Sequence, residues 1–179
     1  MKNQGIKYGL ISGGIASILS LAVYFIDYSL FASLWLLALF LVIGIVIAVL
    51  AVRKEKSNQG NLLSFKDAFV TSFTCLVTAG LLGTIAGILL FNVIDPDLKV
   101  KVADRIMENT YTMMVKFNAP ADAIDETMEE MAHLADDYSA KGQTMGFLKN
   151  LIFYAVIALI IGAIMKSKSD ELRMSDKAL

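Results

Sequence analysis

The sequence contains one cysteine, one histidine and two prolines among 179 residues. A single cysteine, Cys75, cannot form an intramolecular disulfide. A single histidine, His133, excludes the metalloenzyme designs that need several histidine ligands. The sequence also lacks a Gly-rich phosphate loop, a nucleophile elbow, a zincin helix and a paired-cysteine motif. We therefore expect a protein that is not an enzyme and that carries no catalytic residue, no cofactor and no metal site.

Four long segments lack Asp, Glu, Lys, Arg and His altogether: residues 8–26, 29–52, 68–94 and 150–165. Hydrophobic residues make up 56% of the chain, against about 45–50% in soluble domains. A transmembrane helix needs about 20 mostly apolar residues, and the fourth segment reaches this length if it begins near residue 146. Charged residues are costly within the bilayer and are usually retained there for transport. Their absence at mid-depth argues against a pump or a proton-coupled transporter.

The charges outside these segments are distributed unevenly. Residues 95–144 contain eleven acidic and five basic residues, a net charge of −6. The basic residues gather at the other span ends: Lys2, Lys7, Arg53, Lys54, Lys56, Lys66, Lys166 and Lys168. Because Lys and Arg near span ends favour the cytoplasmic side, we expect both termini in the cytoplasm and the acidic segment outside it.

The predicted fold is an all-α membrane protein with four transmembrane helices and an extracytoplasmic helical hairpin between the third and fourth spans. The predicted boundaries are a first transmembrane hairpin over 1–52, a cytoplasmic loop over 53–67, a third transmembrane helix over 68–94, an acidic extracytoplasmic hairpin over 95–145, a fourth transmembrane helix over 146–166 and a cytoplasmic tail over 167–179.

The extracytoplasmic segment carries two helical patterns with apolar residues at alternating steps of three and four, as in helices packed side by side. The first seam consists of Ala103, Ile106, Thr110, Met113 and Phe117, and the second of Ile124, Met128, Met131, Ala135 and Tyr138. We expect a hairpin of about 30 Å standing on the membrane. Its acidic second helix supplies five candidate interaction residues, which are Asp125, Glu129, Glu130, His133 and Asp137.

Two metal sites are alternatives for this segment. Glu129, His133 and Asp137 share a helix face, but zinc usually takes more His or Cys ligands. Five methionines (107, 113, 114, 128 and 131) could suit cuprous ion, although Met is also a common gap filler in helix seams. We favour a solvated acidic surface over either site.

Small residues recur every four positions within the spans, which favours close helix packing in lipid. The predicted packing residues are Gly9, Gly13, Ala79, Gly83, Gly87, Ala158 and Gly162. They indicate an intramolecular four-helix bundle, with a subunit interface as the alternative. At the start of the third span, Ser64 can cap the helix. Phe65 and Phe69 share a face there as an interface anchor or, alternatively, as a docking spot.

Residues 63–69 (Leu-Ser-Phe-Lys-Asp-Ala-Phe), the Ile94-Asp95-Pro96 exit, and the fourth span with Gly162 and its Lys-rich end resemble the four-span bacterial domain-of-unknown-function family 4199. The resemblance covers nearly the whole chain in layout. It implies a Bacteroidota-type protein of a Gram-negative inner membrane, with the hairpin in the periplasm. It implies no activity and no functional residue.

Two functions fit these observations. The first is a non-enzymatic accessory, structural or assembly subunit of an inner-membrane complex, whose partners are the lipid bilayer and either another membrane protein or further copies of this chain. The alternative is a small transporter or channel for a neutral or apolar solute, with a cavity lined by Ser and Thr of the first and third spans. A metal sensor built around His133 is a third, more distant possibility. No nucleic-acid partner is expected.

Overall fold

The computed structural model describes residues 3–167, and every regular element in that range is a helix. Four of these helices are long and apolar enough to cross a membrane: Gln4–Ile26, Leu34–Asn58, Phe65–Ile94 and Ala140–Met165. The predicted all-α fold with four spans is therefore confirmed, and the chain is a multi-pass membrane protein. Most of the predicted tail, from residue 168 onward, lies outside the described residues.

The helix bounds differ from the apolar segments mainly at their polar ends. Helix α1 covers Asn3–Ile26, and α2 covers Leu34–Asn58. Between them Tyr28–Ala32 form a short 3-10 helix, η1, so α2 begins later than residue 29. Helix α2 continues through Arg53 and Lys54, since a helix need not end where the apolar segment does. Helix α3 covers Phe65–Leu89 and α7 covers Ala140–Met165.

The chain divides into two compact units, and each long helix contributes to both. The first unit comprises Met1–Ala16, Phe40–Gly83 and Phe147–Leu179. The second comprises Ser17–Leu39 and Thr84–Gly146. Each unit has its own cluster of buried apolar residues.

Small side chains dominate the core of the first unit. Ala48, Ala51, Ala68 and Ala158 are fully buried, together with Cys75. The same cluster also contains larger side chains, among them Val52, Leu63, Leu76, Ile157 and Ile161. Because lipid tails are as apolar as the helices, such packing depends on close contact rather than on hydrophobic burial.

Within the second unit, the backbone hydrogen bonding changes directly after α3. Leu90–Ile94 form a π-helical turn, η2, in which the Asp95 N–H donates to Leu90 O at 3.0 Å. Pro96 follows, and proline cannot continue a helix interior. The chain then forms α4 (Leu98–Lys116), a turn at Asn118 with φ 53°, and α5 (Ala121–Glu130). A 3-10 turn, η3 (Met131–His133), and one turn of helix, α6 (Leu134–Asp137), lead to α7.

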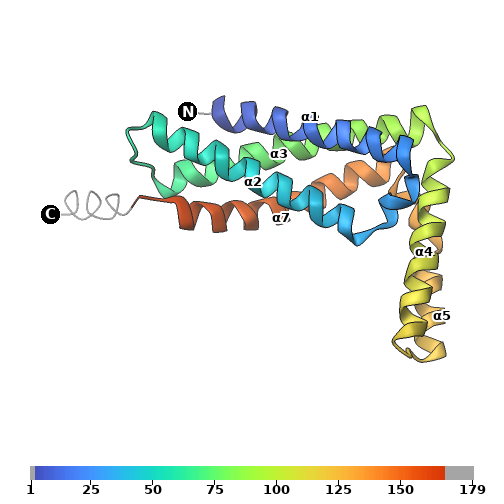
Figure 1. The fold of residues 1–179 in the computed structure, drawn as a ribbon. Coiled ribbons are helices and arrows are strands. Elements are labelled where there is room, and N and C mark those ends of the chain that lie inside the picture. The colour runs from blue at the N-terminus through green and yellow to red at the C-terminus, as the bar shows by residue number, and fades with distance from the viewer. Residues whose placement is uncertain (1–2, 168–179) are drawn as a thin grey trace. The chain divides into compact units, whose positions relative to one another are not determined.

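Helix α4 lies across the ends of the spans in this unit, where the sequence favoured a hairpin standing on them. Its apolar residues Leu98 and Val102 are fully buried in a cluster with Leu90 and Phe91, and Phe31 of η1 packs against this cluster. Further along α4, Asn109 still contacts the chain between the first two spans, at Ala32. Figure 1 shows α4 turning away at the end of α3, with α5 running back beside it.

The seam between α4 and α5 differs from the predicted one on the α4 side. Met113 and Phe117 are exposed, whereas Met114 is half-buried. On the second helix all five predicted positions are half-buried, although η3 interrupts that helix. The alternating spacing therefore located the inner face of α5, while α4 has a second neighbour, η1, that the spacing alone did not reveal.

Candidate functional site

The predicted packing glycines of α1 lie directly against α3. A Cβ atom on Gly9 would be 2.7 Å from the Cys75 carbonyl oxygen and 2.6 Å from Thr78 Cβ. A Cβ on Gly13 would be 2.7 Å from Leu82 Cβ. All three distances are shorter than real contacts allow, so these two positions require glycine for the helices to approach each other.

The predicted α3 stripe does not act as a single surface. The Ala79 carbonyl faces Gly13, whereas a Cβ added to Gly83 would have no atom within 4 Å. Gly87 meets the side chain of Gln143 in the second unit. The three residues thus have three different surroundings.

At the other end of α3, Phe65 and Phe69 pack against α7. A Cβ on Gly162 would lie 3.2 Å from the Phe65 ring and 3.3 Å from the Phe69 backbone nitrogen. Phe65, Phe69 and Phe73 form a stack along α3, with neighbouring ring centroids 6.4 and 5.6 Å apart. Ala158, the predicted packing partner of Gly162, is fully buried. These residues therefore join α3 to α7, and Phe65 remains 40% exposed at the rim.

A network of hydrogen bonds surrounds this end of the first unit. The Asp67 N–H donates to Ser64 Oγ at 3.1 Å, and Ser64 Oγ donates to the Asp67 carboxylate at 2.9 Å. This capping matches the one that the sequence favoured.

The loop after α2 is also fastened to the end of α7. Leu63 N–H donates to Ser167 Oγ at 3.0 Å, and Ser167 N–H donates to Leu63 O at 2.9 Å. Lys56 Nζ donates to Met165 O at 3.3 Å. Beside them, the buried Glu55 carboxylate accepts a bond from Gln59 at 2.8 Å. These hydrogen bonds hold the C-terminal end of α7 against the loop that follows α2.

In the second unit, two amide side chains converge on one backbone carbonyl. Asn92 Nδ2 and Gln143 Nε2 donate to Tyr138 O at 3.1 and 2.8 Å. Asn92 Nδ2 also reaches Ile88 O at 3.2 Å, just before the π turn. Sequence reasoning did not select either residue, although Asn92, an amide within an otherwise apolar segment, was a visible signal. The Tyr138 ring packs on Phe91 at 4.9 Å, and burial raises the pKa of its phenol, with Asp137 adding to the effect.

Two carboxylates at the ends of the spans in the second unit, those of Asp95 and Asp27, accept hydrogen bonds from neighbouring groups. Asp95 accepts a hydrogen bond from Tyr24 Oη at 3.3 Å and lies 3.6 Å from Lys101 Nζ. Asp27 accepts the Ser29 N–H at 2.8 Å and so caps η1. The bonds from Ser29 lower the pKa of the Asp27 carboxyl below its ordinary value.

The acidic residues of α5 and α6 are all exposed: Asp122, Asp125, Glu126, Glu129, Glu130, Asp136 and Asp137. His133 is exposed as well and lies 3.8 Å from Asp136 through Nδ1. Within residues 3–167 no group of three or more His, Cys, Asp or Glu side chains is arranged to hold a metal ion. Of the five methionines considered for copper, Met113 is exposed and the other four are half-buried.

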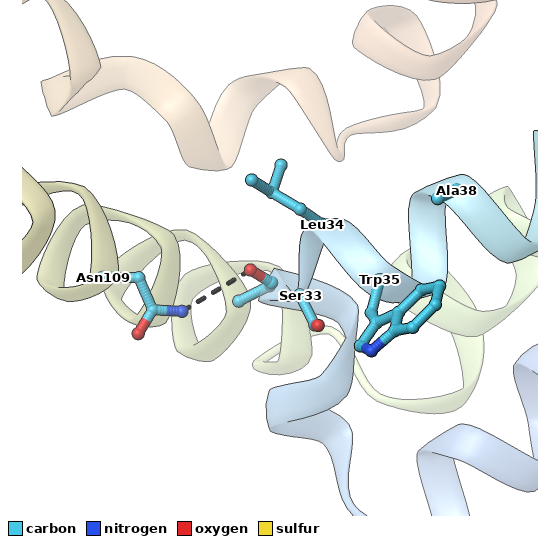
Figure 2. Close-up of a pocket in the computed structure, with 6 residues that line it drawn as sticks. Ser33, Leu34, Trp35, Ala38 and Asn109 are labelled. Atoms are coloured by element: carbon cyan, nitrogen blue, oxygen red, sulfur yellow. Dashed lines mark hydrogen bonds between the residues drawn. The ribbon is translucent and has the colours of Figure 1, made fainter.

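A shallow depression of about 590 Å³ lies between α4 and the start of α2 (Figure 2). Asn109, Ser33, Leu34, Trp35 and Ala38 contribute to its wall, together with Ala32. Asn109 Nδ2 donates to Ala32 O at 3.5 Å across one side of the depression. The Trp35 ring is 82% exposed beside it.

Comparison with known proteins gives one result. The model of a family described as "Protein of unknown function (DUF4199)" matches residues 7–167, so the resemblance seen in the sequence is confirmed. Neither the curated proteins nor the solved structures contain a significant match.

Proposed function

For a chain that belongs to the DUF4199 family of proteins of unknown function, we propose a non-enzymatic role as an accessory or assembly subunit of a bacterial inner-membrane protein complex. Its termini would lie in the cytoplasm, and α4 to α6 would lie in the periplasm. Partner proteins would bind its transmembrane helices and its acidic hairpin.

The exposed acidic face of α5 carries this proposal. The helix has five acidic residues in ten positions, and none of them forms an ion pair with the described part of the chain. No residue of α5 is buried within the described structure. A helix that keeps so much like charge together is suited to a basic partner surface, because complementary charges speed and orient association.

The distribution of basic residues supports the proposed orientation, with the termini in the cytoplasm and α4 to α6 in the periplasm. Arg53, Lys54, Lys66 and Lys166 belong to the first unit and are exposed, while the acidic helix belongs to the second. Lys and Arg concentrate on the cytoplasmic side of membrane proteins.

The packing of the first and third spans favours an accessory subunit over a solute channel. Thr74 and Thr78 lie against Gly5 and Gly9, where there is no room for an added methyl group. The Ser72 hydroxyl is buried and donates to Ala68 O at 2.8 Å. These hydroxyl-bearing residues therefore contribute to helix contacts, whereas a channel would need them to line water.

The test is affinity purification of the tagged full chain from native membranes in mild detergent, with quantification of co-purifying proteins. We expect a stoichiometric partner. The variant Asp125→Asn/Glu129→Gln should reduce its recovery about tenfold, since charged interface pairs contribute on this scale. A control variant, Asp97→Asn/Asp104→Asn, changes the net charge equally on the α4 side of the hairpin and should retain the partner.

Two results would contradict the proposal. One is a chain that always purifies alone and forms no crosslinks in cells. The other is a homo-oligomer without further components, which would favour a channel or transporter.

A further inference from the structure

One face of α4 continues from buried to exposed positions without a break. Leu98, Val102, Ile106, Asn109, Met113 and Phe117 follow one another at steps of four, four, three, four and four. Residues at these steps lie on one side of a helix. They form a single stripe along α4 that ends at Phe117, the residue that caps the helix. We call it the α4 stripe.

The first half of the α4 stripe covers the ends of the spans in the second unit. Leu98 and Val102 are fully buried with Leu90 and Phe91 of η2, and Ile106 packs against the same cluster. Asn109 contacts Ala32, which ends the connection between α1 and α2. Leu98 and Asn109 are about 16 Å apart along a helix that rises 1.5 Å per residue. Because both ends of this stretch contact span ends, α4 runs across the spans rather than away from them.

Trp35 indicates the level in the membrane at which the middle of α4 lies. It lies in the first turn of α2, is 82% exposed, and borders the same depression as Asn109 (Figure 2). Tryptophan is enriched at the level of the lipid headgroups, where the ring contacts both apolar chains and water. Asn109 therefore lies near the headgroup level.

The second half of the α4 stripe extends beyond its contacts within the chain. Met113 is 47% exposed and Phe117 is 80% exposed. They lie about 6 and 12 Å beyond Asn109 along the helix axis, on the side that faces the spans earlier in α4. The adjacent Lys116 has a long apolar stem, and such side chains can hold their charge in the headgroup region.

We propose that the end of α4 docks on the bilayer surface, with Met113 and Phe117 inserted among the headgroups and upper acyl chains of the leaflet beside the second unit. The occupant of this face is phospholipid. Amphipathic helices bind membranes in this way, with the apolar side about 5–10 Å into the interface. The continuity of the stripe with the span-end core favours lipid, since the same face passes from the protein's own span ends to the region where lipid surrounds them.

Docking would also affect how the acidic helix is presented. It would hold α4 and the neighbouring α5 against the membrane, so that a partner of α5 would need to bind close to the bilayer. This inference concerns α4 and lipid alone, and it stands or falls independently of the partner proposed above.

The test measures the lipid contact of Met113 against that of Tyr111. Tyr111 is 51% exposed, two positions away and on the opposite side of α4, so it is a matched control. Full-length Met113→Cys and Tyr111→Cys chains are labelled with bimane and reconstituted in phosphatidylcholine vesicles containing a lipid with a nitroxide near the top of its acyl chain. The wild-type chain, whose Cys75 is buried, serves as the labelling blank.

We expect the nitroxide lipid to quench bimane at position 113 at least about threefold more than at position 111, because only one face of an interfacial helix enters the lipid. Adding Phe117→Ser to the Met113→Cys chain should lower this quenching, since it removes the neighbouring anchor. Equal quenching at the two positions, or quenching at neither, would overturn the proposal. Protection of position 113 from both the nitroxide lipid and a water-soluble quencher would also overturn it, by indicating that a second copy of the chain covers the stripe.

Discussion

The two units hold their helices together by different means. In the first unit, Gly9 brings the backbones of α1 and α3 into contact, and the core includes four fully buried alanines. In the second, aromatic rings and amide side chains make the contacts, as with Phe91, Tyr138 and Asn92. Within lipid, helices gain little by burying more apolar surface, and close approach matters most. Where water is near, large rings gain from burial, and a carbonyl at a helix end such as that of Tyr138, which caps α6, needs donors from elsewhere.

The two kinds of contact also differ in how well they tolerate a substitution. A glycine at a backbone contact tolerates no side chain, whereas a carbonyl with two amide donors retains one if the other is lost. The first unit should therefore be sensitive to single added atoms, and the second should be sensitive mainly to combined losses.

The largest effect is expected from Gly9→Leu. Its Cβ would overlap Cys75 O and Thr78 Cβ, which would force α1 away from α3. Overpacking of this kind costs about 3 kcal/mol. Unfolding of the full chain in mixed micelles by increasing sodium dodecyl sulfate measures the loss.

Gly14→Leu provides the matched control for that experiment. Gly14 has nothing within 4 Å of a Cβ position, so the same substitution should change the free energy of unfolding by less than about 1 kcal/mol. Similar losses at the two positions would show that leucine is disfavoured in α1 for a reason other than contact with α3.

An intermediate effect is expected at the Tyr138 carbonyl. Asn92→Leu and Gln143→Leu should each cost about 1 kcal/mol, because the carbonyl keeps its other donor, while the double variant should cost about 3 kcal/mol by leaving it without either. A double-mutant cycle on the same unfolding measurement gives the coupling between the two side chains. Strictly additive losses would mean that the two amides do not act on a shared acceptor.

The smallest effect is expected at the start of η1, where protonation of Asp27 should weaken its hydrogen bonds with Ser29. Its pKa is lowered in the folded chain by the Ser29 hydrogen bonds. Its contribution is therefore present above the ordinary aspartate pKa and is lost as the pH falls through the lowered value. Hydrogen exchange of the Ser29 amide, corrected for its intrinsic pH dependence, should lose protection at acidic pH. In Asp27→Asn this pH dependence should disappear, and its persistence would assign the effect to another group.

Part of the candidate site could be read from the sequence. The α1 glycines and Gly162 were selected by spacing alone, and they occupy close contacts with α3. Gly83 has the same spacing and meets nothing. Spacing identifies a face of a helix, but it does not specify whether another helix lies opposite. The amides Asn92 and Gln143 were missed because their importance depends on a single carbonyl brought to them by the fold.

The sequence by itself determined that the chain is helical, that four of its helices can cross a membrane, and that residues 95–144 are rich in acidic side chains. Each of these follows from composition and local periodicity, because backbone groups in lipid must be satisfied within a helix. Only the tertiary structure decided that α4 lies across the span ends and that Met113 and Phe117 remain exposed. The position of α4 depends on η1, a neighbour distant in sequence. The direction of α4 after Pro96 depends on the apolar surface that its own apolar residues cover. That surface includes parts of the chain distant in sequence, so no local pattern encodes it.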